Sequence, residues 1–179
     1  GSGEMGSKSG LTTLGTQLVE EMNRLGMIID ISHMNETGFF DIVELTKDPF
    51  IATHSNCSAL CDHHRNLTDD QIKALAEKGG VLHLSYCGGF IKKGITRENL
   101  DEVSLNDWLD HLDYAIDLVG PNHVGLGSDF DGGCGFPGLS DATMIPNVTR
   151  GMVAREYSDE DIEKVLGGNF LRVFNKVIS

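Results

Sequence analysis

The chain has 179 residues, which is enough for one domain with its own hydrophobic core. Lys and Arg together number 14 and Asp and Glu 27, which gives a formal net charge of −13. This acidic character argues against binding to nucleic acid, which requires basic residues to neutralise phosphates, and against docking on anionic lipid. No apolar run approaches the ~20 residues that cross a bilayer, so no membrane span is expected.

Residues 1–9 are rich in Gly and Ser and carry no hydrophobic periodicity. We interpret them as a tag or a disordered loop stub and assign residues 10–179 to the folded domain. Four cysteines occur without a Cys-x-x-Cys pair, and Cys57 and Cys61 are interpreted as small core residues. The sequence shows no secretory signal and is not dense in cysteine, so a cytoplasmic location is expected.

The N-terminal third is predicted to contain two helices and two strands. Apolar residues at spacings of three and four predict a helix over 11–25, and the nearly continuous apolar run 27–31 is typical of a strand buried on both faces. A second helix follows Asn35, a good N-cap, and ends before Pro49 because proline disfavours helix in the residue preceding it. Residues 50–53 are the next predicted strand.

The remainder of the chain continues this alternation. A capping box, Thr68-Asp-Asp-Gln71, opens the next helix, and two further strands are expected over 81–86 and 123–130. The segment 88–103 is expected to be a loop that can contain one short turn. The helices expected around these strands lie over 69–78, 105–119, 146–156, 159–166 and 169–177.

Strands and helices that alternate about every 25 residues are typical of βα units on a parallel sheet. Only four strands are clear in the sequence. A closed TIM barrel of the (β/α)8 type needs eight strands and typically ~250 residues. The fold class is therefore α/β, and the chain describes about half of a barrel or a small open sheet.

Two histidines follow neighbouring predicted strands. His33 comes after 27–31 and His54 after 50–53. The carboxyl ends of parallel strands are where α/β barrels gather metal ligands and catalytic groups, and neighbouring strands lie only ~4.8 Å apart. The pair is therefore a candidate to bind one hydrolytic zinc ion. Either histidine alone would more often be structural, and the pairing makes the two interpretations even.

Three further residues could contribute chemistry to the same edge of the sheet. Asp129 ends the fourth strand and is a candidate metal ligand, general base or anchor for a substrate amine, whereas Asp131 better fits a turn before the glycines that follow. Arg65 could hold a substrate carboxylate through two parallel hydrogen bonds. A surface salt bridge is the alternative for Arg65. His83 is expected in the core or facing the pore, and His111 carries no functional prediction.

Five segments, in order along the chain, resemble the renal (membrane) dipeptidase family, peptidase family M19, of the amidohydrolase superfamily. They lie over 23–33, 52–55, 64–70, 125–132 and 168–174. The resemblance implies a TIM-barrel dipeptidase with two zinc ions, in which a hydroxide that bridges the metals attacks the peptide bond. His33 and His54 match zinc ligands of the family. Arg65 matches the arginine that binds the carboxylate of the dipeptide, and Asp129 matches the catalytic aspartate near the bridging water and the substrate amine.

The resemblance also has gaps. The His-x-Asp motif that the family carries on its first strand, the Glu that bridges the metals and an earlier substrate-contacting His have no counterpart. Residues 10–179 thus resemble the C-terminal half of a family member, with four βα units, the closing helices and ligands for one metal position at most. The missing N-terminal half or a second copy is the expected partner. The alternative is a non-catalytic half-barrel that associates with itself or with a partner chain. Another amidohydrolase, such as a lactonase or a deaminase, is a third interpretation that Arg65 disfavours.

Overall fold

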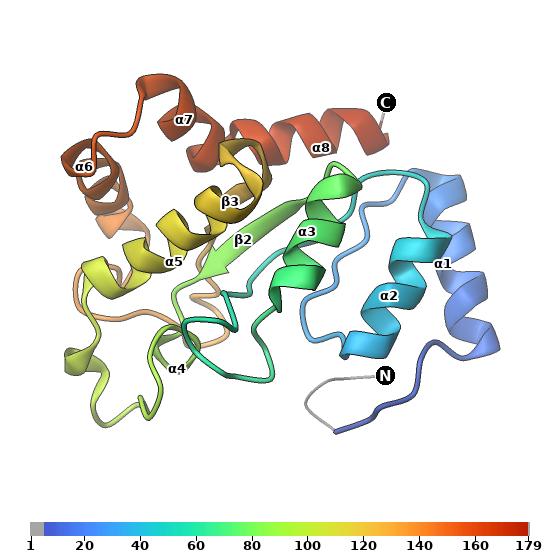
Figure 1. The fold of residues 1–179 in the computed structure, drawn as a ribbon, viewed down its shortest axis with the longest axis horizontal. Helices are drawn as coiled ribbons and strands as arrows, with labels where there is room; N and C mark the ends of the chain where they lie inside the picture. Colours follow the sequence, from blue (N-terminus) through green and yellow to red (C-terminus); the bar gives the residue numbers. More distant parts are fainter. Residues whose placement is uncertain (1–5, 179) are drawn as a thin grey trace.

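The computed structural model describes residues 6–178, in which helices surround a small parallel sheet (Figure 1). The strands are β1 (Ile51–Ala52), β2 (Val81–Ser85) and β3 (Val124–Gly127), in the spatial order β1-β2-β3. Ile51 pairs with Val81, and Leu82 pairs with Val124. The chain is therefore α/β with parallel pairing throughout this sheet, as the alternation of elements predicted.

The strand predicted over 27–31 is wrong in extent. This segment reaches the sheet through one parallel bridge, between Asp30 and Ile51. The N–H of Ile31 donates to the Ile51 carbonyl, and the N–H of Ile51 donates to the Ile29 carbonyl. Toward Met27 the ladder stops because its next partner, Pro49, has no N–H to donate. Beyond Ile31 it stops because the N–H of Thr53 donates to the Asp30 side chain, 3.0 Å away, and not to a backbone carbonyl.

The helices agree closely with the sequence prediction up to residue 119. They are α1 (Thr13–Leu25), α2 (Glu36–Leu45), α3 (Asp69–Glu77) and α5 (Leu105–Val119), and both Thr68 and Ser104 open theirs with a complete capping box. The predicted loop 88–103 contains short helical turns. These turns are α4 (Gly88–Ile91) and the 3-10 turn η2 (Leu100–Glu102).

The C-terminal helices differ from the prediction at their ends. Helix α6 (Pro146–Ala154) stops two residues early, and α7 (Asp159–Glu163) gives way to the π-helical turn η5 (Lys164–Gly168) before α8 (Asn169–Ile178) begins. Two 3-10 turns, η3 (Pro121–His123) and η4 (Ala142–Met144), complete the set of elements. Among residues 6–178, no helix is both long and apolar enough to cross a bilayer.

The two faces of the sheet are covered differently. Leu82 and Leu84 of β2 point into the main core, which they share with Trp108 and Leu109 of α5. Val81 points the other way and packs with Val173 and Val177 of α8, the helix along the top of Figure 1. The second face is thus covered by α8 near the start of the strands.

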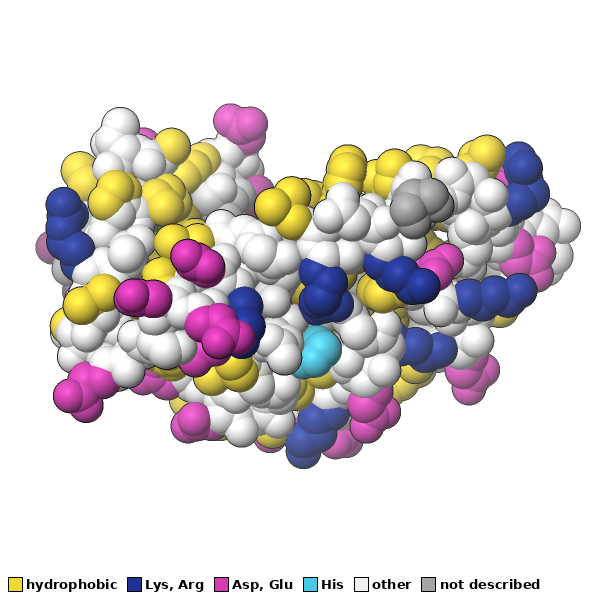
Figure 2. All heavy atoms as spheres, turned by 90° about the horizontal axis from the view of Figure 1, so that it is seen from above, with side chains coloured by type: hydrophobic (Ala, Val, Ile, Leu, Met, Phe, Trp, Pro, Cys, Tyr) yellow, Lys and Arg dark blue, Asp and Glu magenta, His cyan; other side chains and the backbone are white. Residues whose placement is uncertain are grey.

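Many large apolar side chains remain at the surface of α1 and α8. Leu14 is 74% exposed and Leu171 is 56% exposed. The others on these two helices are Leu18, Leu25, Phe170, Phe174 and Ile178. Seen from above, hydrophobic side chains reach the surface in several clusters, many of them along the upper border of Figure 2.

Of the segment interpreted as a tag or stub, residues 1–5 lie outside the described part of the chain. The carbonyl oxygens of Ser7 and Ser9 accept hydrogen bonds from the Asn35 amide, at 2.6 and 2.9 Å. Asn35 also caps α2, because its Oδ1 accepts the N–H of Gly38 at 2.8 Å. This asparagine therefore ties residues 7–9 to the start of α2.

Candidate active site

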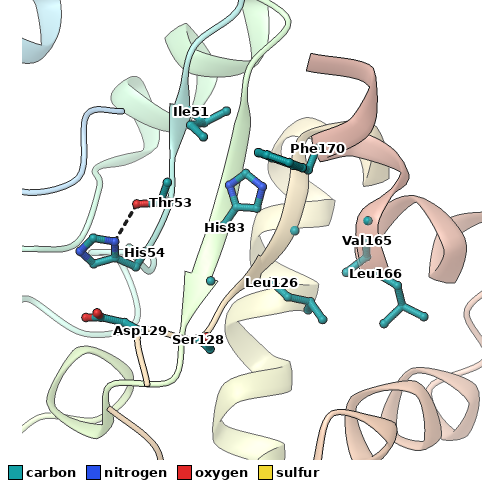
Figure 3. Close-up of a pocket in the computed structure, with 13 residues that line it drawn as sticks. Ile51, Thr53, His54, His83, Leu126, Ser128, Asp129, Val165, Leu166 and Phe170 are labelled. Carbon is teal, nitrogen blue, oxygen red and sulfur yellow. Dashed lines mark hydrogen bonds between the residues drawn. The ribbon is translucent and has the colours of Figure 1, made fainter. Parts of the chain in front are cut away.

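The two histidines predicted to act together lie side by side. The ring centroids of His33 and His54 are 5.0 Å apart, and the rings meet edge to face. His54 and Asp129 line one cavity of about 420 Å³, and Figure 3 shows both side chains at the carboxyl ends of their strands, pointing to the same side. The structure thus brings together three of the residues that the sequence selected.

The backbone at this edge of the sheet is held in an uncommon conformation. His33 has φ of 70° and Asp129 has φ of 60°, and Glu156 is the one other non-glycine residue with positive φ in the described chain. The left-handed region is sparsely populated for residues with a Cβ, although Asp and His enter it more often than most. Such conformations cost ~1–3 kcal/mol and gather at functional sites. Two of the three non-glycine residues with positive φ therefore lie in the candidate site.

The loop after β3 packs closely around Asp129. The carbonyl oxygen of Asp129 accepts the N–H groups of Gly132 and Cys134, each at 3.1 Å. A Cβ on Gly132 would lie 2.3 Å from Asp129 Oδ1, so any other residue there would displace the carboxylate. Asp131 is exposed on the same turn, in keeping with its predicted role as a turn residue.

Hydrogen bonds hold both the backbone and the ring of His54. Its N–H donates to Ser32 Oγ at 3.0 Å, and its Nδ1 lies 2.7 Å from the Thr53 hydroxyl. Burial lowers the pKa of the His54 imidazole, and the carboxylate of Asp129 opposes this only in part. The ring is therefore neutral at neutral pH, which is the form that binds a metal ion.

Arg65 lies in the interior and not at the surface. Arg65 is only 7% exposed, and its guanidinium carbon lies 5.2 Å from the centre of the Phe90 ring. Arg65 and His33 line a second cavity, of about 260 Å³. The histidine pair therefore lies between a cavity that holds Asp129 and a cavity that holds Arg65.

Two other histidines have structural contacts. His111 is 1% exposed; its Nδ1 accepts the N–H of Cys57 at 3.2 Å, and its Nε2 lies 3.0 Å from the Ile91 carbonyl. His83 lines the larger cavity, as its predicted core or pore position requires, and its Nδ1 lies 2.9 Å from the Ala52 carbonyl.

Sequence reasoning missed two features of the site. The first is the carboxylate of Asp30, which accepts the N–H groups of Ser32 and Thr53, the residues before His33 and His54. The sequence signal that could have revealed it is a charged residue inside the apolar run 27–31. The second is a disulfide between Cys87 and Cys134, which joins the loops after β2 and β3. Cys57 and Cys61 are free and buried, as expected of small core residues.

The donor set fits part of a metal centre. Within residues 6–178, no group of three His, Cys, Asp or Glu residues is placed to hold a metal ion. His33 and His54 would provide two of the three protein ligands that a catalytic zinc takes. The remaining donors would have to come from outside the described part of the chain.

Residues 2–179 match the family described as Membrane dipeptidase (Peptidase family M19). The chain belongs to this family. It is 39% identical over 168 residues to the uncharacterized protein of the pqqA 5′ region of Klebsiella pneumoniae, a match that covers 94% of the chain and 61% of that protein. It is also 39% identical over 169 residues to dipeptidase AclJ of Aspergillus oryzae, covering 94% of the chain and 39% of that protein.

A solved structure shares the fold of this chain. It is a metallo peptidase from Rhodobacter sphaeroides, liganded with a phosphinate mimic of the dipeptide L-Ala-D-Ala. The two share 36% identity with a TM-score of 0.90, over 99% of this chain and 49% of that one. The chain thus spans between about a third and two thirds of the length of the relatives that it matches.

Proposed function

We propose that this chain is the C-terminal half of a TIM-barrel dipeptidase, and that its parent protein hydrolyses the peptide bond of dipeptides with zinc. The parent is the longer protein that would supply the other half of the barrel. One observation carries the proposal: His33, His54, Arg65 and Asp129 lie around two adjoining cavities at one edge of a parallel sheet. A scaffold without activity has no need for this set.

In this proposal His33 and His54 hold zinc together with ligands from the N-terminal half. Zinc, when bound, supplies Lewis-acid chemistry that polarises a carbonyl group and acidifies water. Support for this role comes from the neutral state of His54 and from the contact between the two imidazoles.

Arg65 and Asp129 act on the dipeptide. The guanidinium of Arg65 is fixed over Phe90 and would hold the carboxylate of the substrate in a two-pronged hydrogen bond. Asp129 lies beside His54 at the other cavity, where its carboxylate would bind the substrate amine or take a proton from the attacking water. A cation and an anion on opposite sides of the histidine pair are the charges that the two ends of a zwitterionic dipeptide would need.

The alternative is a half-barrel without activity that associates with a second copy or a partner chain. The exposed apolar side chains of α1 and α8 favour association, since large exposed apolar surfaces mark interfaces. Sedimentation of the purified chain tests this. A dimer is expected, and a stable monomer with a cooperative, high-temperature melt would count against association.

The activity itself is tested with the parent protein and with this chain alone. We expect two zinc ions and hydrolysis of Gly-Leu by the parent, and at most one zinc without turnover for the isolated chain. Asp129→Asn should abolish most turnover in the parent, whereas the matched variant of the exposed neighbour, Asp131→Asn, should leave it unchanged. A parent without stoichiometric metal and without turnover would refute the proposed function.

A further inference from the structure

Asp30 connects the ends of two neighbouring strands. Its Oδ1 accepts the N–H groups of Ser32 and Thr53, each at 3.0 Å, and its Oδ2 lies 2.7 Å from the Thr53 hydroxyl. Each strand end is followed at once by a histidine of the site: Ser32 by His33, and Thr53 by His54. One carboxylate therefore sets the position of both imidazoles.

The direction of the hydrogen bonds follows from the number of protons. The Thr53 hydroxyl lies 2.7 Å from Asp30 Oδ2 and 2.7 Å from His54 Nδ1, but it has only one proton to donate. An ionised carboxylate can only accept, so that proton goes to Asp30. The hydroxyl oxygen then accepts a hydrogen bond from His54, whose Nδ1 must carry the proton.

The second ring nitrogen of His54 is left as an acceptor. With Nδ1 protonated, the neutral ring has its lone pair on Nε2. Figure 3 shows the bond from Thr53 to the ring, with the other nitrogen on the side away from Thr53. A metal ion binds the unprotonated nitrogen, and the partner of the opposite nitrogen determines which one that is.

We propose that Asp30 is a positioning residue of this site, which acts through the Thr53 hydroxyl to keep His54 protonated on Nδ1 and to present Nε2 to a ligand. The inference rests on the proposed function for the identity of that ligand, a zinc ion. The tautomer itself is a property of the protein without metal, so the two can be tested separately.

The role of the hydroxyl is separable from the structural role of the carboxylate. Thr53 makes two contacts with Asp30, one through its backbone N–H and one through its hydroxyl. Thr53→Val removes the hydroxyl and keeps the backbone contact, and Thr53→Ser restores the hydroxyl. Asp30→Asn is more informative, because the introduced amide can donate to the hydroxyl, which would then donate to His54 Nδ1 and reverse the tautomer.

The experiment is nitrogen NMR of histidine side chains in the metal-free parent, labelled with ¹⁵N-histidine. At about pH 8, above the usual histidine pKa of ~6.5, long-range proton–nitrogen correlations tell which ring nitrogen carries the proton. We expect His54 to be protonated on Nδ1 in the unchanged protein and in Thr53→Ser. Thr53→Val should raise the Nε2-protonated fraction, and Asp30→Asn should make it the major form.

The same spectra contain their own reference. The ring nitrogens of His111 have contacts that do not involve Asp30 or Thr53, so the His111 signals should not change. Zinc affinity, measured by competition with a chelator, should fall by ~10–100-fold in Asp30→Asn, the range for loss of a partner behind a metal ligand. An unchanged protein with His54 protonated on Nε2, or an unaltered tautomer in both Asp30→Asn and Thr53→Val, would overturn the proposal. A parent without dipeptidase activity would refute the proposed function and leave the tautomer result standing.

Discussion

Replacing Gly127 with alanine tests how closely β3 packs on the strand end that carries His54. Gly127 is the last residue of β3 and pairs with Ser85. A Cβ there would lie 2.2 Å from the Thr53 carbonyl oxygen and 2.7 Å from the His83 carbonyl oxygen. Non-bonded heavy atoms prefer about 3.5 Å, and both neighbours are backbone atoms, so the strands must separate by roughly 1 Å.

The consequence should appear in both stability and activity. Overpacking a tight interior costs ~1–3 kcal/mol, and we expect Gly127→Ala to fall in the upper part of that range because no flexible side chain can absorb the clash. Thr53 immediately precedes His54, and Asp129 follows Gly127 by two residues. A shift of this size at reacting groups costs roughly 100-fold in rate, so kcat of the parent should fall by about that factor.

The matched control is Gly15→Ala in helix α1, because Gly15 lines neither cavity of the candidate site. A Cβ built on Gly15 would lie 3.3 Å from the flexible side chain of Leu11, and alanine favours helix more than glycine does. The free energy of unfolding of this variant should stay the same or rise by up to ~1 kcal/mol, and kcat of the parent should not change. Urea unfolding and hydrolysis of a dipeptide measure the two effects. Equal unfolding midpoints and equal kcat for the two variants would refute the packing argument.

Three further predictions concern the clamp, the disulfide and pH. Arg65→Lys in the parent should raise KM for a dipeptide by ~30-fold, about 2 kcal/mol, with little change in kcat, because lysine keeps the charge and loses the two-pronged geometry. An unchanged KM in steady-state kinetics would show that Arg65 does not bind the substrate. The Cys87–Cys134 disulfide closes a loop of 47 residues. Its reduction should lower the free energy of unfolding by about 4 kcal/mol, because the unfolded chain gains conformational entropy. Urea unfolding curves that coincide with and without reductant would contradict this. Burial lowers the pKa of both His83 and His111, so on acidification these histidines take up protons in the unfolded chain before they do in the folded one. The free energy of unfolding should therefore fall as the pH drops below ~6.5. An unfolding midpoint that is the same above and below pH ~6.5 would show that these rings are not buried.

Local rules account for what could be predicted along the chain. The capping boxes at Thr68 and Ser104 begin helices where expected, because the groups that satisfy the first N–H donors lie within three residues of each other. The placement of His33 and His54 at neighbouring strand ends also followed from the sequence, since each comes directly after an apolar run. The prediction of a full strand over 27–31 failed because the neighbouring segment has Pro49 where an N–H would have to pair with Met27, so only the bridge at Asp30 forms.

The sequence by itself determined the alternation of elements, the family and the residues that could do chemistry, because helix caps, apolar runs and motif spacing are properties of short segments. Only the tertiary structure decided that Arg65 is buried over Phe90, and that Cys87 meets Cys134. It also decided that Asp30 joins two strand ends. The contacts of Arg65 with Phe90, of Cys87 with Cys134 and of Asp30 with Thr53 join residues 23 to 47 positions apart. Such pairings arise from how the elements pack around the sheet, and no local pattern records them.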